Sequence, residues 1–294
     1  MELFYKVNNN KYENIRDVLK GHFLISANLL TKLKQNNKIF YNGGNTYLDH
    51  PINIDDEILV KLDFEEESDN IVLYDIDIDI VYEDDCMLII NKPSNMPVHP
   101  SILHYDDTLS NAVKNYYIKN NIHSKIRPVN RLDKDTTGLV IFAKNQYIQE
   151  LFIKQMKSND LKKYYLAILE GHLDKKEGII DAPIARKDNS IIERTIDKNG
   201  FESKSYYKLI KNFNKSNTDL SLVEFSLETG RTHQLRVHSK YIGHSILGDT
   251  LYGTKSDLIL RQALHAYKID FIHPIKKEAM TIKVDLPEDM KKII

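Results

Sequence analysis

The stretch RPVNRLDKDTTGLVIFAKN, residues 127–145, joins a polar turn to an apolar run. The turn contains Asp133 and Asp135, with Arg131 two residues before the first aspartate. The run GLVIFA is typical of a buried strand. Between them, Thr-Thr-Gly at 136–138 favours the bend that leads from the turn into the strand. The stretch therefore predicts a strand that presents a carboxylate at its beginning.

A calcium loop is the first alternative for this turn. Asp133, Asp135, Thr137 and Gly138 fit positions 1, 3, 5 and 6 of an EF-hand. Position 12 of such a loop must be a bidentate Glu, but here it is Lys144. Because a strand follows the turn where a helix is required, we expect no metal here.

The composition favours a soluble protein with one large domain or two unequal ones. The chain has 294 residues, of which 41% are hydrophobic and 28% are charged. It contains no run of 18 apolar residues, and its first residues lack the pattern of a signal peptide. Cys86 is the single cysteine, which excludes intrachain disulfides and cysteine-built zinc sites. We therefore expect a cytoplasmic protein that does not contact membranes.

The net charge of −1 hides an uneven distribution. Residues 63–85 contain 11 of the 42 acidic residues and neither Lys nor Arg, which leaves 41 basic against 31 acidic residues elsewhere. A basic face for nucleic acid phosphates is thus available. The alternative is that these lysines only solvate the surface.

The first 62 residues predict a small unit of helices and strands. Asn14 and Ser26 can cap helices over about 15–20 and 27–36, and KIFYNGGN and EILVKLD are typical of strands. This order resembles the S4 RNA-binding domain, which the residues Arg16, Ser26, Asn42 and Gly43 also fit. The resemblance implies that Arg16, Lys20, Lys32 and Lys34 face RNA phosphates, whereas the alternative is a helical cap without a ligand.

The acidic segment 63–70 has the composition of a linker, so we expect domains at 1–65 and 66–294. Beyond it, the alternating segment 71–85 predicts a strand with Asp75, Asp77 and Asp79 on one solvated face. Helices are expected at 108–119 and 145–157, and further strands at 86–93, 162–171, 203–213, 219–230, 263–272 and 279–286. Consecutive strands with few helices favour an α+β fold with a largely antiparallel sheet.

The segment LETGRTHQLRVHSKYIGHSILGDTLYG, residues 227–253, is the second that could carry chemistry. Thr232 can cap a helix over about 233–242, which would place His233 and Arg236 on one face. The histidines of this segment are five and six residues apart, which is not a metal-binding spacing. An arginine at the start of a helix can instead keep a nearby carboxylate ionised in an apolar pocket.

Together these segments resemble the RluA family of RNA pseudouridine synthases. The similarity rests on RPVNRLDKDTTGLVIFAKN, KKYYLAILEG and GRTHQLRVHSKYIGHSILGDTLYG in this order, with NKPSNMPVHPS and ALHAYKIDFIHP in support. It implies a small S4-like N-terminal domain and a catalytic domain with a bent, mostly antiparallel mixed sheet. The family acts without metal or cofactor.

The resemblance also implies roles for individual residues. The catalytic aspartate falls on Asp133, the tyrosine of the KKYYLAILEG motif on Tyr165, and the arginine that follows GRTHQL on Arg236. Arg131 is implied to take the place of the displaced base, and Arg231 and His233 are expected to contact RNA. Three positions depart from the family pattern: Asn130 where His is usual, Asn95 where Gly is usual, and Thr137 for Ser.

The expected function is therefore conversion of uridine to pseudouridine in RNA by a monomer. Large-subunit ribosomal RNA is the expected substrate, with transfer RNA as the alternative. Asp133 could act as a nucleophile or as a base. Two rival functions are an RNA-binding protein without the reaction, which the three catalytic residues disfavour, and a metal-dependent nuclease, for which acidic ligands around the histidines are missing.

Overall fold

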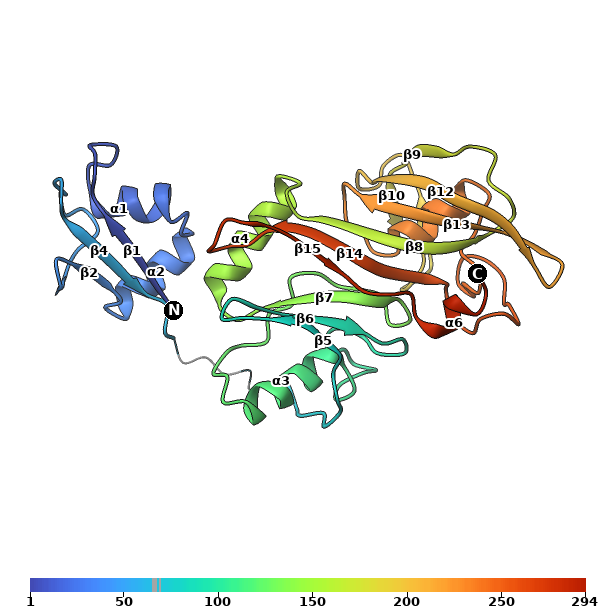
Figure 1. The fold of residues 1–294 in the computed structure, drawn as a ribbon, viewed down its shortest axis with the longest axis horizontal. Coiled ribbons are helices and arrows are strands. Elements are labelled where there is room, and N and C mark those ends of the chain that lie inside the picture. Colours follow the sequence, from blue (N-terminus) through green and yellow to red (C-terminus); the bar gives the residue numbers. More distant parts are fainter. Residues whose placement is uncertain (65–67, 69) are drawn as a thin grey trace.

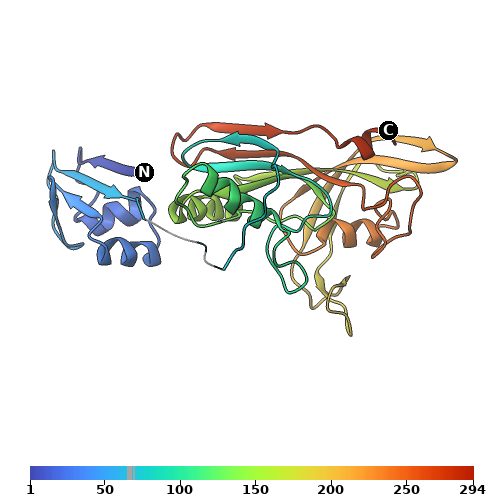
Figure 2. The same cartoon turned by 90° about the horizontal axis from the view of Figure 1, so that it is seen from below.

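The computed structural model describes residues 1–64, 68 and 70–294. The predicted domain boundary at residue 65 and half of the acidic segment 63–70 lie outside the described residues. Among those described, no helix is long and apolar enough to cross a bilayer. Figure 2 shows a small group of N-terminal elements at one end of the molecule and a large sheet at the other.

The N-terminal residues form an antiparallel sheet covered by short helices. Its elements are β1 (Glu2–Lys6), α1 (Ile15–Asp17), the π-helical turn η1 (Val18–His22), α2 (Ala27–Gln35), β2 (Ile39–Tyr41), β3 (Gly44–Asn45) and β4 (Glu57–Lys61), in the sheet order β1-β4-β2-β3. Both predicted caps are confirmed, because Asn14 accepts from the backbone of Asp17 and Ser26 from that of Leu29. Strand β1 was not predicted, since its five residues show little alternation.

The remaining elements build the large sheet and its flanking helices (Figure 1). They are β5 (Ile80–Glu83), β6 (Met87–Lys92), α3 (Leu109–Lys119), β7 (Thr137–Ala143), α4 (Gln146–Lys157), β8 (Lys162–Glu170), β9 (Glu177–Asp181), β10 (Ile184–Arg186), β11 (Arg194–Ile196), β12 (Lys204–Lys215), β13 (Thr218–Leu227), α5 (Gln234–Tyr241), β14 (Leu264–Ile272), β15 (Ala279–Lys283) and α6 (Glu288–Lys291).

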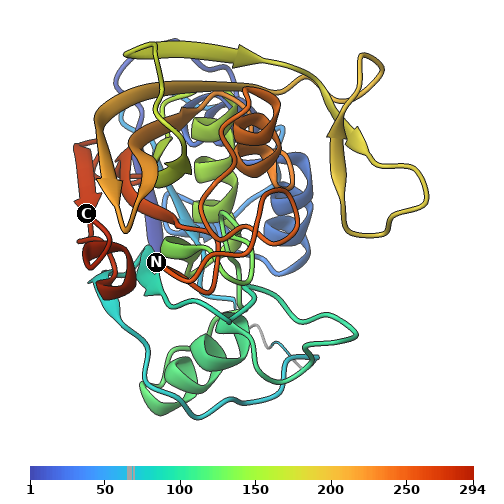
Figure 3. The ribbon, with the colours of Figure 1, turned by 90° about the vertical axis from the view of Figure 1, so that its right-hand side faces the viewer.

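The large sheet confirms the predicted mostly antiparallel mixed arrangement. Its order is β5-β6-β7-β14-β8-β13-β12-β9, with β15 added beside β14. The pair β7 and β14 is parallel, and the other pairs described in this sheet are antiparallel. Register shifts in β12 and β14 mark irregularities at which strands bend. Strands β9, β10 and β11 and helix α6 were not predicted. Figure 3 shows the segment of β10 and β11 standing out from the large sheet.

The junction of β7 and β14 explains the glycine in the opening stretch. Gly138 pairs with Ala266 and has φ of +114°, and a Cβ added there would lie 2.2 Å from the carbonyl oxygen of Ala266. Only glycine permits this backbone approach. The turn that precedes β7 is closed by the Thr136 amide, which donates to the Asp133 carbonyl at 3.1 Å. The predicted bend into a buried strand is therefore confirmed.

The strand predicted over residues 71–85 is wrong for most of its length, because only β5 is extended and paired. Asp75 accepts from Asn115 and pairs with Lys119, both on α3, and Asp79 accepts from Asn91. All three aspartates are exposed, as predicted, but Asp75 and Asp79 are held by side chains of neighbouring elements and the segment is not a strand. The alternation of residue types could not reveal partners about 40 residues away along the chain.

Helix α4 connects the large sheet to the N-terminal elements. Its cap, Asn145, accepts from the backbone of Ile148 as predicted. Ser26 donates to Glu150 at 2.7 Å, and the Tyr147 hydroxyl donates to the Phe23 carbonyl at 2.8 Å. The two groups of elements are thus joined by side-chain hydrogen bonds as well as by the chain.

Candidate active site

Asp133 lies at the turn before β7, and its carboxylate faces α5. Its Oδ2 accepts from Arg236 Nη1 at 3.1 Å and lies 3.8 Å from His233 Nε2. The side chain of Asp133 remains 26% exposed, so the carboxylate is open to an incoming molecule on its other side. The sequence placed these two charges 103 residues apart, and the fold brings them into contact.

Arg236 is held in place by a second carboxylate, that of Asp249. Arg236 donates to Asp249 through Nε at 2.7 Å and through Nη2 at 2.8 Å, which is the bidentate geometry of a strong ion pair. Burial alone would lower the pKa of Arg236, but Asp249 and Asp133 raise it above its ordinary value. The guanidinium therefore carries a fixed positive charge directed at Asp133.

Asp249 was quoted in the sequence segment GDTLYG but received no role. It is fully buried and also accepts from the backbone amides of Leu251 and Tyr252. A buried carboxylate requires such a set of donors. An aspartate among apolar residues was the available signal, but its partner on α5 could not be derived from spacing alone.

Tyr165 lies on β8 and lines the same cleft as Asp133. It is buried to 6% exposure. Burial, and to a smaller extent the charge of Asp133, raises the pKa of its hydroxyl. The side chain therefore stays a neutral phenol at neutral pH, suited to stacking and to hydrogen bonding.

The cleft has a volume of about 670 Å³ and carries an excess of positive charge. Its lining includes Arg131, Lys163, Arg194 and Arg231, whereas Asp133 is the one acidic residue among the described residues that line it. Such a cleft suits a polyanion whose reacting part reaches a single carboxylate.

The beginning of α5 differs from the prediction. Thr232 is not the cap: the helix begins after His233, which has φ of 57° and no capping side-chain bond. Gln234 instead accepts from the Arg231 amide at 3.0 Å and the Thr229 hydroxyl at 2.9 Å. These bonds shape the turn before the helix and leave His233 directed at the Tyr252 hydroxyl, at 2.8 Å.

The remaining residues predicted for RNA are divided between the cleft and the N-terminal helices. Arg131 is exposed and Arg231 donates to the Glu202 carbonyl, and both line the cleft. Arg16 forms an ion pair with Asp49. Arg16, Lys20 and Lys32 are not among the residues that line the cleft. The structure thus does not bring these three N-terminal residues into the candidate active site.

Asn130, which replaces the expected histidine, has a structural place. Its side chain accepts from the Ile141 amide at 2.9 Å and donates to the Leu139 carbonyl at 3.1 Å. It is 7% exposed. Asn130 therefore fixes the segment before Asp133 to strand β7.

Lys92 also supports the turn that carries Asp133, although no role was predicted for it. The side chain is fully buried, and its ammonium donates to the carbonyls of Pro93, Met96 and Lys134 at 2.7, 2.8 and 2.9 Å. Burial lowers the pKa of Lys92 to about 7, against the raising effect of Asp135 and Asp133. Since Lys134 follows Asp133, this contact positions the turn.

We expect Lys92→Met to lower the free energy of unfolding by about 3 kcal/mol, because buried carbonyls lose their donor. Urea unfolding measures this change. Lys134→Met is the matched control, because Lys134 contributes only its backbone carbonyl to the contact. The stability of this variant should stay within about 0.5 kcal/mol of wild type. Equal stability of the two variants would contradict the role given to Lys92.

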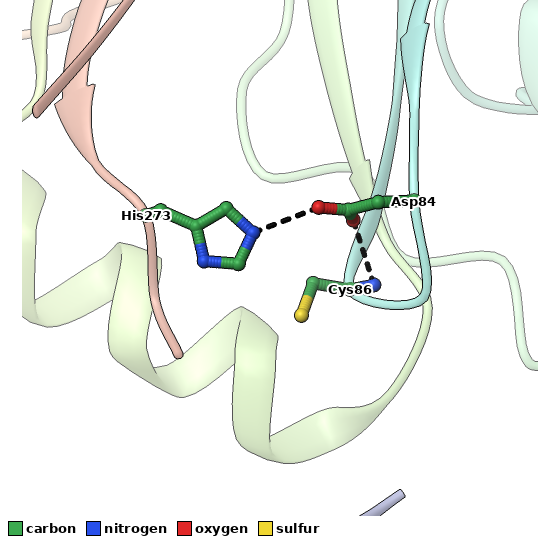
Figure 4. Close-up of side chains that lie close together, drawn as sticks. All are labelled: Asp84, Cys86 and His273. Carbon is green, nitrogen blue, oxygen red and sulfur yellow. Dashed lines mark hydrogen bonds and ion pairs between the residues drawn. The ribbon is translucent and has the colours of Figure 1, made fainter. Parts of the chain in front are cut away.

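A second polar cluster lies away from this cleft (Figure 4). Asp84, Cys86 and His273 have donor atoms within 4.8 Å of one another, and they line a separate hollow of about 770 Å³. His273 Nδ1 accepts from the amides of Ile275 and Lys276, so its Nε2 carries the proton donated to Asp84 at 2.7 Å.

The Asp84 carboxylate is also hydrogen-bonded, and the Cys86 thiol is protonated. Asp84 accepts from the Cys86 and Met87 amides and from the Tyr82 hydroxyl. Burial, followed by the charge of Asp84, raises the pKa of the Cys86 thiol to about 12. The cluster is therefore best described as a hydrogen-bonded clamp between the β5–β6 turn and the end of β14.

Comparison with known proteins identifies the family. A profile described as RNA pseudouridylate synthase matches residues 86–241, which include Asp133, Tyr165 and Arg236. The chain belongs to the RNA pseudouridylate synthase family. Relatives in Bacillus subtilis are the uncharacterized RNA pseudouridine synthases YjbO, 35% identical over 93% of this chain and 96% of the relative, and YhcT, 40% identical over 81% and 78%.

Other members of the family agree with the RluA-type resemblance. The ribosomal large subunit pseudouridine synthase D of Zymomonas mobilis is 38% identical over 74% of this chain and 72% of its own. The structure of human RNA pseudouridylate synthase domain containing 1 superposes with a TM-score of 0.60 at 26% identity, covering 71% of this chain and 83% of that one. The protein is thus an RNA pseudouridine synthase, which converts uridine to pseudouridine in RNA.

Five histidines of the pseudouridine synthase make its stability depend on pH. The pKa is lowered in His22, His99, His233, His238 and His265, in each case chiefly by burial, and that of His265 falls to about 4. The unfolded chain therefore binds protons between about pH 6.5 and 4 that the folded chain does not, so stability falls as the pH drops through this window.

We expect urea unfolding at pH 5 to show a free energy lower than at pH 7. His265 alone contributes on the order of 3 kcal/mol once the pH reaches its lowered pKa. His265→Asn is expected to reduce the pH dependence. Equal stability at both pH values would contradict this prediction, because it would mean that these histidines bind protons equally well in the folded and in the unfolded chain.

Proposed function

We propose that this enzyme modifies a uridine of large-subunit ribosomal RNA, with Asp133 as the catalytic carboxylate. The observation that carries the proposal is the line of charges from Asp133 through Arg236 to buried Asp249, placed beside Tyr165 in a cationic cleft. The name of the Zymomonas mobilis relative supports ribosomal RNA as the substrate.

The reaction requires a carboxylate that remains ionised beside the target nucleotide. The N1–C1′ bond of uridine breaks, the uracil turns, and a C5–C1′ bond forms; the proton of C5 leaves and N1 gains one. Asp133 can attack the sugar as a nucleophile or remove a sugar proton as a base. Both roles need the negative charge, which the fixed cation of Arg236 stabilises.

The other cleft residues would hold the extruded nucleotide. Extrusion of a base costs roughly a few kcal/mol of lost stacking. We assign to Arg131 the space that the base leaves, because its side chain is exposed at the cleft. Tyr165 stacks on the uracil, and Arg231 and His233 contact the flanking RNA.

The N-terminal residues are proposed to form an S4-like RNA-binding domain, with domains at 1–65 and 66–294. Two short helices against a four-stranded sheet support this division. Lys20 is exposed and Lys32 is half-buried on those helices, while Arg16 already pairs with exposed Asp49. We further propose that the enzyme acts as a monomer in the cytoplasm, where its RNA substrate is made.

The test is incubation of the purified protein with unmodified transcripts. One reaction contains large-subunit ribosomal RNA and another contains a pool of transfer RNAs, and pseudouridine is then mapped in each. We expect modification at one or a few positions of the ribosomal transcript. Modification of transfer RNA alone would refute the substrate while leaving the reaction intact.

A further inference from the structure

Lys163 is a cation in the active-site cleft without a partner in the described chain. It lies on β8, two residues before Tyr165, and lines the cleft. Alternate residues of a strand share a face, so Lys163 and Tyr165 point to the same side. Among the described residues, neither a carboxylate nor a hydrogen-bond acceptor lies within bonding distance of its ammonium.

The ammonium of Lys163 lies beside Gly230. Its Nζ lies 3.5 Å from where a Cβ of Gly230 would be, next to the turn that carries Arg231. The side chain is half-buried, and burial lowers the pKa of Lys163. Two other cations of the cleft already have hydrogen-bond acceptors, because Arg194 and Arg231 both donate to backbone carbonyls.

A half-buried charge without a counterion is unfavourable until an anion arrives. The RNA backbone supplies that anion as phosphate, for which a lysine ammonium is a suitable point charge. Residues two apart on a strand are separated by roughly 7 Å, comparable to the distance from a base to its own backbone phosphate. A base stacked on Tyr165 would thus place a phosphate near Lys163.

We propose that Lys163 binds a phosphate of the RNA backbone beside the uridine that enters the cleft. This inference rests on the RNA substrate proposed above, and it assigns Lys163 to substrate positioning. The neighbouring Lys162 offers a matched comparison, because it is exposed and points to the opposite face of the strand.

The experiment measures RNA affinity as a function of salt. Dissociation constants are determined over a range of KCl concentrations for wild type, Lys163→Met, Lys163→Arg and Lys162→Met. The probes are a single-stranded oligouridylate and, separately, the large-subunit ribosomal transcript. Each phosphate contact adds about 0.7 to the slope of log affinity against log salt for single-stranded RNA.

We expect Lys163→Met to lower this slope by about 0.7 and to weaken binding about tenfold at 0.1 M salt, with the rate at saturation changed less than about threefold. Lys163→Arg should recover the slope, and Lys162→Met should leave it unchanged. An unchanged slope in Lys163→Met on both probes would overturn the inference. So would a fall in the saturated rate at constant slope, which indicates a contact with the reacting base.

These outcomes are separable from the proposed function. Wild-type modification of the ribosomal transcript tests the substrate, whereas the salt slopes test Lys163 whether or not that transcript is modified. We expect the variants to melt near the wild-type temperature, because methionine is similar in length to the lysine that it replaces. Melting temperatures measure whether the fold is retained.

Discussion

Purified enzyme with Asp133→Asn is expected to bind RNA with nearly wild-type affinity and to form pseudouridine at least about 10³-fold more slowly. The amide keeps the size of the carboxylate and can still accept a hydrogen bond from Arg236, so the cleft should keep its shape. It lacks the negative charge that either proposed role of Asp133 requires. Single-turnover conversion of the ribosomal transcript measures the loss.

Asp135→Asn is the matched control in the same turn. Asp135 lies in this turn but does not line the cleft, so the rate of Asp135→Asn should stay within about threefold of wild type. A residual rate within tenfold of wild type in Asp133→Asn would mean that another group performs the reaction.

The second large effect is expected for Asp249→Ala. Removal of this carboxylate leaves the buried guanidinium of Arg236 without its bidentate partner. Breaking a buried ion pair on one side costs about 3–5 kcal/mol of stability. We also expect at least a hundredfold loss of rate, because Arg236 is then free to turn away from Asp133.

The double variant Arg236→Met with Asp249→Leu separates the two consequences. Apolar residues of similar volume can replace a buried ion pair at little cost, so most of the stability should return. Activity should not return, because the cation beside Asp133 is missing. Urea unfolding and single-turnover rates measure both, and an active double variant would show that Arg236 is dispensable.

Local chemistry explains which elements could be predicted. Helices α3 and α4 begin after Thr108 and Asn145, whose side chains cap the first turn, and such caps depend on residues three positions apart. Strand β7 is buried along its whole length, and β8 contains the apolar run 164–169 between its charged ends. Both signals are contained within one segment.

The errors arose where distant residues decide the structure. Residues 71–79 alternate like a strand, but the side chains of α3 hold them in another path. The start of α5 depends on Gln234, whose side-chain amide donates to the Lys204 carbonyl and the Ser205 hydroxyl at the start of β12. Neither contact can be derived from the residue types of its own segment.

The candidate site likewise contains residues that the sequence could predict and residues that it could not. Family motifs predicted that Asp133, Tyr165 and Arg236 would lie together, and they do. The residues that support them, Asp249 and Lys92, were missed because their roles depend on partners supplied by the fold. Their roles could be assigned only from the distances between buried atoms in the structure.

The most direct test of the central claim is pseudouridine mapping in cells that lack this gene. RNA from these cells should have lost pseudouridine at specific positions of large-subunit ribosomal RNA. Expression of the wild-type protein should restore every lost position, and expression of Asp133→Asn at the same level should restore none. Restoration by Asp133→Asn, or an unchanged ribosomal map in the deletion strain, would contradict the account.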